Sequence, residues 1–582
     1  MIATERDGRL LVALAPAIVV AVTAVFALPG EAGGFRLAKS GAFGLALSVV
    51  GAVLLTRRTP FSFPRQWGAL AGFVAAAALL PACSGSVSSA HWPNVLGLLS
   101  GLALFIATPV ALAEHPDARR ASLILLVATG ACCAAVVLMQ AAGLRWLTSD
   151  SYTGLEFRAP GTFGNPNWAA AFLAALVPLS LALARTTERS RLYHGIAGLL
   201  SIAAVATVSK GGAAALVAGV LVYVALDRTL SNRRRNAIVV GVAASVVLAL
   251  AVAWEWELFA TAPWLKGRLF LWRAALHLVS EQPLTGVGLG GYPAAYGHAA
   301  AALVHGDASA FIPLSSIDFA HNDLLQYAAE AGVVTAALFV LVVVSALVQA
   351  YRSNDPCSRA VGAAVSVVFV HGLVDAPMRV PSTFVLFFFL LGYLVPASQR
   401  ATPRWLVFVP IVLLGAFQGV RFTAGNTYWT RGRDALRAGR PAARPLERAQ
   451  RLLPEHGRSA SQLARALARA GRIDDALAAA GQAAALRFDF DDEIFRLDLR
   501  ARSLDREGAL RAWSEFSARF PMLVTPYLRL GALYLQANDR AAAIAAYESV
   551  LANPQPTRRA EAARAQARQI LPRLLAKPLP AR

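Results

Sequence analysis

Apolar residues are grouped along this chain in long runs, which short polar or basic connections separate. A helix needs about 20 apolar residues to cross a bilayer, because each residue adds only about 1.5 Å of rise. Runs that approach this length recur throughout the first 420 residues. They predict about twelve to thirteen membrane spans, at 9–28, 39–55, 67–82, 94–113, 121–140, 167–184, 194–208, 211–226, 237–255, 325–350, 360–376, 382–397 and 404–420.

The overall composition agrees with this pattern. Of the 582 residues, 57% are hydrophobic, and the mean hydropathy of +0.52 is far above that of an ordinary soluble protein. The first run resembles a signal peptide, but the many later runs favour a retained helix. We therefore expect an all-α fold, a polytopic membrane helical bundle with a large outer loop and a C-terminal helical-repeat domain.

Arginines are concentrated in alternate connections, as the positive-inside rule requires of the cytoplasmic side. These connections hold Arg6, Arg9, Arg57, Arg58, Arg65, Arg119, Arg120, Arg185, Arg189, Arg191, Arg228, Arg233, Arg234, Arg235, Arg352, Arg359, Arg400 and Arg404. The opposite connections include 83–93, which has no Lys or Arg, and the long loops 141–166 and 256–324. An odd number of spans places the C-terminal region in the periplasm of a Gram-negative cell, outside its inner membrane. One span fewer would place that region in the cytoplasm.

The formal net charge of +21 is divided between these anchors and a charged C-terminal tail. It forms no basic block interleaved with aromatic residues on which bases would stack, so we expect no nucleic-acid partner. The four cysteines show neither a CxxC nor a Cys/His spacing; they are Cys83, Cys132, Cys133 and Cys357. We therefore expect no metal site and no disulfide framework.

After about residue 421 the apolar runs end and amphipathic helical periodicity begins. Similar segments recur at intervals of about 33 to 34 residues, marked by Ala476, Ala509 and Ala543 and then by Ala480, Trp513 and Tyr547. This period matches a tetratricopeptide-type helix pair. Two interpretations are open: a generic helical tail, or a concave docking surface for a partner.

The first long outer loop ends in RAPGTFGNPNWAA, from Arg158 to Ala170. Its glycines and proline predict a tight turn, after which Asn167 is suited to cap the following helix. The functional alternative is a loop folded over the bilayer surface, in which Arg158 and Asn165 face a ligand.

Lys210 lies in the segment VSKGGAA, between two short apolar runs where an unpaired charge is costly. It either extends to the lipid headgroups or faces a phosphate, which the adjacent glycines would allow to approach the backbone closely.

The second outer loop contains GRLFLWRAALHLVSEQPLTGVGLGGY, from Gly267 to Tyr292. In a helix, Arg268 and Trp272 share a face by their i, i+4 spacing, whereas Arg273 points elsewhere. Arg268 either anchors the helix at the interface or grips a phosphate through its guanidinium group. The later glycines match GxGxxG, but they neither follow a strand nor open a βαβ unit, so we expect a tight turn and no dinucleotide.

The segment HNDLLQYAAEAGVVT begins at His321, at the start of a long apolar run. Asn322 is suited to cap this helix, and Asp323 to its positive end. Asn322, Gln326 and Glu330 fall on one face at i, i+4 and i+8, which predicts a face turned toward water or substrate. His321 is then placed to take a proton from a hydroxyl group.

A second polar pair, His371 and Asp375, ends the eleventh predicted span in HGLVDAPMRVP. Their i, i+4 spacing would let Asp375 orient His371. A polar contact between helices is the structural alternative.

Together these segments resemble the O-antigen ligase and O-antigen polymerase superfamily, which includes bacterial O-linked protein oligosaccharyltransferases. The resemblance covers roughly residues 150 to 400. It rests first on the histidine signature of that superfamily: His, then Asn, Ser or Gln, nine residues, Gly, two residues, and Gly, Thr or Tyr. This signature is fitted completely by His321, Asn322, Gly332 and Thr335. GTFGNPN, HGLVDAP and the segment with Arg268, Trp272, Pro283, Gly286 and Gly288 also look like family blocks. One departure is Lys210, which replaces the arginine of a Ser-Arg-Gly block and so loses bidentate phosphate geometry.

The resemblance implies a metal-independent, cofactor-free glycosyl transfer on the periplasmic face. The donor would be a glycan on undecaprenyl diphosphate, and the acceptor lipid A–core, a growing glycan or a protein. Arg268 and Lys210, with Arg158, would bind the diphosphate, and His321 would accept the acceptor's proton with inversion at the anomeric carbon. The remaining substrate-binding candidates are Asn165, Asn322, Trp272, His371 and Asp375.

We expect three regions: N-terminal membrane helices at 1–140, a ligase-like catalytic membrane region at 141–420, and helical repeats at 421–582. Two other functions compete with the enzyme. A transporter or flippase predicts charged residues at mid-membrane and inverted repeats, neither of which is clear in this sequence. A scaffold would use the repeats to recruit polysaccharide-assembly proteins around a non-catalytic membrane part.

Overall fold

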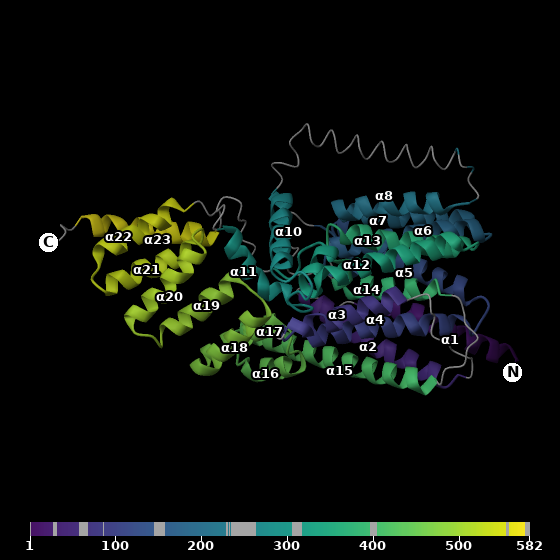
Figure 1. The fold of residues 1–582 in the computed structure, drawn as a ribbon, viewed down its shortest axis with the longest axis horizontal. Coiled ribbons are helices and arrows are strands. Elements are labelled where there is room, and N and C mark those ends of the chain that lie inside the picture. Colours follow the sequence, from purple (N-terminus) through teal and green to yellow (C-terminus); the bar gives the residue numbers. More distant parts are fainter. Residues whose placement is uncertain are drawn as a thin grey trace.

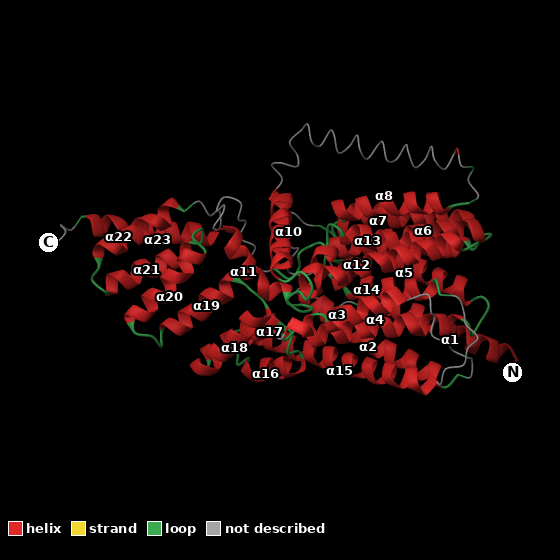
Figure 2. Ribbon diagram, in the orientation of Figure 1, coloured by secondary structure: helices red, strands yellow, loops and turns green. Residues whose placement is uncertain are grey.

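The structure, a computed structural model, describes residues 2–26, 32–57, 68–84, 87–144, 158–228, 231, 233, 263–304, 317–395, 404–553 and 558–576. Within these ranges every regular element is an α-helix or a short 3-10 helix, which confirms the expected all-α fold (Figure 2). Figure 1 shows a bundle of long helices with a group of shorter helices attached to one end.

The bundle consists of α1 (Ile2–Val25), α2 (Ala32–Leu55), α3 (Gly68–Leu79), α4 (His91–Leu112), α5 (Ala118–Ala141), α6 (Pro166–Thr186), α7 (Ser190–Ala206), α8 (Lys210–Leu226), α12 (Asp323–Arg352), α13 (Pro356–Gly372), α14 (Pro381–Tyr393) and α15 (Arg404–Arg437). Among the described residues, seven helices are long and apolar enough to cross a membrane: α1, α2, α4, α5, α6, α12 and α15. Shorter apolar helices fall on further predicted spans, namely Gly68–Ser84, Ser190–Ala206, Lys210–Leu226 and Pro381–Tyr393. The predicted span at 237–255 lies outside the described residues. The chain is thus a polytopic membrane bundle. The described helices that are long enough to cross a membrane are fewer than the spans predicted from the apolar runs.

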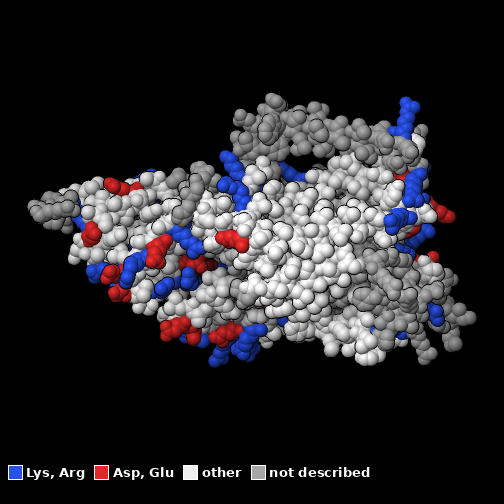
Figure 3. Space-filling view, in the orientation of Figure 1, with Lys and Arg blue, Asp and Glu red and all other residues white. Residues whose placement is uncertain are grey.

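Three described arginines of the alternate connections lie at the same end of the bundle, where α2, α12 and α14 end. There Arg119 donates to the carbonyl of Tyr393, Arg228 to that of Tyr351, and Arg404 to that of Leu54. Figure 3 shows basic side chains gathered at the right, beside a broad surface without charges. We call this the basic end, and the opposite end, where α4, α6, α8, α12 and α14 begin, the site end. The charge pattern is the one expected; which end faces the cytoplasm stays a prediction.

Small residues let the bundle helices approach one another closely. A Cβ on Gly44 of α2 would lie 2.4 Å from the backbone nitrogen of Gly419 in α15, and one on Gly219 of α8 would lie 2.1 Å from a methyl group of Val367 in α13. Such contacts favour helix association in lipid, where the hydrophobic effect between helices is absent. The α2–α15 contact matters most for the architecture, because α15 also carries the tail.

The tail extends from the site end and consists of short antiparallel helices. They are α16 (Ala443–Leu452), α17 (Gly457–Arg469), α18 (Ile473–Leu486), α19 (Phe490–Ala501), α20 (Arg506–Arg519), α21 (Val524–Gln536), α22 (Arg540–Ala552) and α23 (Arg558–Leu575). The helix pairs α17–α18, α19–α20 and α21–α22 begin at residues 457, 490 and 524, which are 33 and 34 residues apart. The six marker residues of the predicted repeat are all buried in the second helix of a pair: Ala476, Ala480, Ala509, Trp513, Ala543 and Tyr547. Assignment to the tetratricopeptide class stays a prediction.

The boundary expected near residue 421 falls inside α15, which continues as one helix from the basic end into the tail (Figure 1). A hydropathy change therefore marks where the helix leaves its apolar surroundings and does not mark a break in the backbone. The tail is consequently joined to the bundle by a rigid element.

Two helices lie between the bundle and the tail. α10 (Pro263–Glu281) is the helix expected in the second outer loop, and it runs across the direction of the bundle helices (Figure 1). α11 (Tyr292–Val304) falls where only a loop was expected. It packs against the tail, where the backbone nitrogen of Phe488 donates to the carbonyl of Pro293 at 2.8 Å and the Phe488 ring covers Gly297.

The turn after α10 is inserted into a break in α12. At Ala331 and Gly332 the helix loses its regular dihedral angles, and Gly332 has φ 82° and ψ 163°. The freed backbone pairs with the turn: Val287 and Gly288 donate to the carbonyls of Ala329 and Glu330, at 3.0 and 2.8 Å. A Cβ on Gly332 would lie 2.0 Å from the carbonyl oxygen of Leu284. Gly332, the glycine of the histidine signature, is therefore needed for this turn to pack into the break in α12.

Gly332→Ala should destabilise the protein by roughly 3 kcal/mol or more, because it combines a backbone conformation that L-residues avoid with a backbone clash. The matched control is Gly198→Ala in α7, where a Cβ meets nothing within 4 Å. That control should be neutral or stabilising by about 0.5–1 kcal/mol. Denaturant unfolding in detergent measures both, and equal stability of the two variants would contradict the role given to Gly332.

Candidate active site

His321 lies at the site end, immediately before α12, in a backbone conformation that its neighbours stabilise. Its φ of 52° is in the left-handed region, which a non-glycine residue rarely adopts. Asn322 caps α12 by accepting from the backbone nitrogen of Leu325 at 3.0 Å, as expected, and its amide donates to the carbonyl of Leu373 at 2.9 Å. The left-handed residue and the two-sided cap together fix the direction in which the imidazole projects.

The imidazole of His321 is held by the carboxylate of Asp375. Nδ1 of His321 lies 2.8 Å from Oδ1 of Asp375, whose side chain is only 3% exposed. The backbone nitrogen of Ala376 donates to the same oxygen at 2.9 Å, and a guanidinium nitrogen of Arg268 lies 3.6 Å from the other. Burial alone would raise the pKa of this carboxyl, but its hydrogen bond and electrostatic interaction with His321, together with the charge of Arg268, hold the pKa well below its ordinary value.

The pairing of Asp375 corrects an expectation. The i, i+4 spacing would let Asp375 orient His371, and a polar contact between helices is the alternative. The carboxylate instead contacts His321, because it follows the end of α13, where the backbone is no longer helical. His371 is buried, and its two ring nitrogens form no hydrogen bond within the part of the chain that the structure describes. A Cβ on Gly211 would lie 3.6 Å from His371 Nε2, so His371 lies beside the start of α8.

Arg268 and Trp272 share a face of α10, as their spacing predicts, and that face meets His321. Arg268 donates to the carbonyls of Val374 and His321, and Nε1 of Trp272 donates to the His321 carbonyl at 3.3 Å. Arg273 is exposed. The two α10 side chains thus join the segment before α12 to the segment after α13, and they hold the His321–Asp375 pair between them.

The start of α8 lies beside this group. Ser209 caps the helix by accepting from the nitrogen of Gly212, and Lys210 is its first residue. A Cβ on Gly211 would come within 2.7 Å of a methyl group of Val374, so the helix terminus touches the segment that carries Asp375. Lys210 is therefore brought to the same end as His321, with an exposed side chain.

The first outer loop has a structural role in the described residues. The cap of α6 is Asn165, which accepts from the nitrogen of Asn167 at 2.8 Å, and not Asn167 as expected, because the helix begins at Pro166. Arg158 donates to the carbonyl of Thr207 at 3.0 Å and to the side-chain oxygen of Asn167 at 2.9 Å. These contacts tie the loop to the end of α7 and favour the capping interpretation of the segment.

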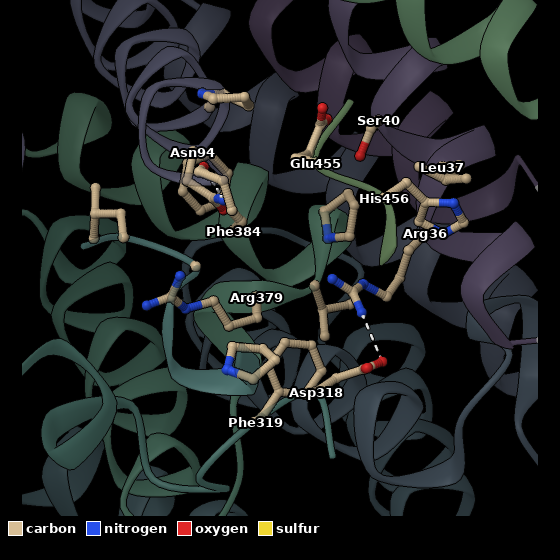
Figure 4. A pocket seen from close by; sticks show the side chains of 18 of the residues that line it. Arg36, Leu37, Ser40, Asn94, Asp318, Phe319, Arg379, Phe384, Glu455 and His456 are labelled. Carbon is tan, nitrogen blue, oxygen red and sulfur yellow. Dashed lines mark hydrogen bonds and ion pairs between the residues drawn. The ribbon is translucent and has the colours of Figure 1, made fainter. Parts of the chain in front are cut away.

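A cavity of about 290 Å³ opens between the bundle and the tail, beside His321. Figure 4 shows Arg36, Asp318, Phe319, Arg379 and His456 in its wall. The Phe319 ring faces the cavity and meets the imidazole of His321 edge-on, with 6.4 Å between centroids. The cavity and the His321 site are thus neighbours that share the segment 317–321.

The charges of the cavity wall are paired. Asp318 lies 3.5 Å from Arg36 and 3.1 Å from Arg458, and Arg379 lies 2.6 Å from Glu330. Burial would raise the pKa of the Asp318 carboxyl, but Arg458 and Arg36 lower it. The same burial, with Arg458, lowers the pKa of His456 to about 3, so this imidazole is neutral at ordinary pH.

The sequence reasoning missed Arg36, Asp318 and Arg379. A signal for two of them was present: Arg36 and Arg379 are arginines next to spans on the side that the positive-inside rule leaves poor in positive charge. Gln326 and Glu330, expected on an inward face of α12, do line the cavity, and Gln326 donates to Glu330 at 2.9 Å.

The arrangement provides a base and cations at one end of an apolar bundle. Nδ1 of His321 is occupied by Asp375, while the side chain is 35% exposed and Nε2 forms no hydrogen bond among the described residues. An imidazole held in this way can accept a proton at Nε2, and the buried carboxylate stabilises the resulting cation. Separately, His277, Glu281 and His298 form a group with metal-ligand chemistry.

Comparison with known proteins agrees with the expected relationship. Residues 195–340 match the model of a family described as O-antigen ligase. The matched segment contains Lys210, Arg268, Trp272 and the whole histidine signature from His321 to Thr335. It supports the superfamily that the sequence motifs indicate, and with it a membrane function of the O-antigen ligase or polymerase type. No curated protein matches the chain.

Arg268→Ala should lower the free energy of unfolding by roughly 3 kcal/mol, because it leaves the buried Asp375 carboxylate with one cation fewer. Combining it with Asp375→Asn should cost less than the sum of the two single changes, with a coupling of about 1–3 kcal/mol. The control in the same helix is Arg273→Ala, expected within about 0.5 kcal/mol of wild type. Denaturant unfolding in detergent gives all four values, and additive effects would argue against the Arg268–Asp375 contact.

Proposed function

Starting from the O-antigen ligase domain at residues 195–340, we propose that this protein is a membrane glycosyltransferase. It transfers a glycan from undecaprenyl diphosphate to an acceptor hydroxyl on the periplasmic face of the inner membrane. The observation that carries the proposal is the His321–Asp375 pair, held by Arg268 at the end of an apolar bundle with one imidazole nitrogen open. A base at this position can meet a substrate whose lipid lies in the membrane and whose sugar lies in water.

His321 acts as the general base. Its Nδ1 proton is held by Asp375 at 2.8 Å, so Nε2 carries the lone pair that accepts the proton of the acceptor hydroxyl. The acceptor oxygen forms a bond to the anomeric carbon, and the bond from that carbon to the diphosphate oxygen breaks. The diphosphate leaves with the bonding electrons, and an in-line displacement inverts the anomeric centre.

The leaving diphosphate needs positive charge, and two groups supply it. Lys210 is exposed at the N-terminus of α8, where the helix dipole adds to its charge. Arg268 carries five N–H donors, and its described contacts with Val374, His321 and Asp375 leave donors for a phosphate oxygen. Arg268 thereby positions the base and stabilises the developing negative charge.

The cavity beside Phe319 is suited to the sugar part of a substrate. Its charges are paired, so it offers hydrogen-bond donors and acceptors without a large excess of either sign. Its aromatic rings, among them Phe43, Phe319 and Phe384, provide apolar faces against which sugar rings can pack. Its position between bundle and tail favours a long acceptor, a growing glycan or a protein, over a small one.

The distribution of charge favours the enzyme over a transporter. The pairs Arg268–Asp375 and Arg379–Glu330 lie at the site end, where α12 begins and α13 ends, and not halfway along the spans. A flippase for the same lipid would need polar groups at the membrane centre.

His321→Ala should lower glycan transfer by about 10²–10⁴-fold, because the acceptor oxygen loses its base. The assay uses full-length protein in nanodiscs, with undecaprenyl-diphosphate-linked glycan extracted from its own host. Lipid A–core, periplasmic protein and donor alone serve as alternative acceptors. The matched control is His194→Ala, which removes an exposed histidine at the start of α7.

Each result has a definite meaning. Longer glycan from donor alone identifies a polymerase, and transfer to lipid A–core or to protein identifies a ligase or a protein glycosyltransferase. Folded wild type that consumes no donor with any acceptor would refute the enzyme. Full activity of His321→Ala would refute the assigned base.

Lys210→Ala should raise the KM for the lipid-linked donor by roughly tenfold, since one charge-assisted contact to phosphate is lost. Lys210→Arg should retain a KM near that of wild type, because the charge is kept. Arg189→Ala, which removes an exposed charge at the basic end, controls for a general effect of charge. An unchanged KM in Lys210→Ala would exclude a phosphate contact.

A further inference from the structure

Three side chains with metal-binding atoms meet where α10 and α11 come together. His277 and Glu281 are one turn apart near the end of α10, and His298 projects from α11. Oε1 of Glu281 lies 3.3 Å from Nε2 of His277 and 2.8 Å from Nε2 of His298. All three ligand atoms lie within 4.8 Å of one another. Tertiary folding thus brings His298 next to His277 and Glu281, which are already neighbours on one helix.

Hydrogen bonding within the group leaves one atom unsatisfied. Nε2 of His298 is within hydrogen-bond distance of the carboxylate. Nε2 of His277 is buried and forms no hydrogen bond among the described residues, although the same carboxylate is near. A buried polar atom without a partner costs free energy, and a cation between the three ligands would satisfy it.

The geometry suits a small divalent transition-metal ion. Imidazole nitrogens and a carboxylate oxygen are ligands of Zn²⁺ at about 2.0–2.2 Å, and tetrahedral ligands are then about 3.3 Å apart. The observed separation of 3.3 Å equals this distance and the one of 2.8 Å is shorter, so a small rotation that moves His298 and Glu281 apart suffices. His298 is 60% and Glu281 40% exposed, which leaves water access to the remaining coordination position.

We propose that His277, Glu281 and His298 bind one divalent transition-metal ion of the Zn²⁺ type, which ties α10 to α11. The expectation of no metal site was based on the cysteines, and none of the three ligands is a cysteine. The ion does not take part in glycosyl transfer: His277 follows Arg268 by nine residues, which is about 14 Å along a helix.

The site lies on the path that joins the tail to the active-site helix. α11 contacts α10 through the hydroxyl of Tyr292, which donates to the carbonyl of Leu271 at 3.1 Å. α11 also contacts Phe488 of the tail. An ion bridging α10 and α11 would therefore stiffen the helix from which Arg268 and Trp272 reach His321.

The test is metal binding by the full-length protein, purified without a histidine tag and stripped with a chelator. Calorimetry with Zn²⁺, followed by metal analysis after dialysis, should show one ion per chain in wild type. Glu281→Gln and His298→Ala should each weaken binding by at least roughly tenfold, since each removes one of three ligands. His194→Ala and Cys83→Ser should bind Zn²⁺ like wild type, because both residues lie elsewhere.

Thermal unfolding gives a second readout that is independent of glycan transfer. Zn²⁺ should raise the unfolding temperature of wild type and leave those of Glu281→Gln and His298→Ala unchanged. The replaced side chains are 40% (Glu281) and 60% (His298) exposed, so the variants should fold without metal. The proposal is wrong if wild type binds no stoichiometric Zn²⁺, if both ligand variants bind Zn²⁺ as tightly as wild type, or if binding disappears in Cys83→Ser.

Discussion

The site end of the bundle depends on one constraint, the burial of a carboxylate. Asp375 is almost fully removed from water, and a carboxylate in that position is stable only with cations and N–H donors around it. His321, Arg268 and the backbone nitrogen of Ala376 meet this need. These groups come from different parts of the chain, so satisfying one charge brings together α10, the start of α12 and the end of α13.

A second set of contacts holds the same helices in register. The break in α12 at Gly332 exposes backbone groups that the turn after α10 satisfies, and Glu330 beside the break pairs with Arg379. The histidine signature therefore combines two physical requirements: a capped helix start at His321 and Asn322, and a helix break ten residues later. The first presents the imidazole, and the second fixes α10, from which Arg268 reaches it.

The tail is part of the same assembly and not an appendage on a linker. It continues α15, whose glycines pack against α2, and it contacts α11 through Phe488. The cavity between bundle and tail has walls from both, with Asp318 bridging Arg36 of α2 and Arg458 of α17. Any movement of the tail would therefore change the shape of the cavity beside His321.

Apolar runs determined the all-α membrane fold, because a segment in lipid must satisfy its backbone hydrogen bonds internally. Local spacing also determined the cap at Asn322, the shared face of Arg268 and Trp272, and the period of the tail helices. These features depend on residues within a few turns of one another. Tertiary structure alone decided that Asp375 serves His321 and not His371, that Arg36 and Arg379 line a cavity, and that His298 joins His277 and Glu281. Such contacts link residues that are far apart in the chain. Which residues pair depends on which buried charges must be neutralised where the helices meet.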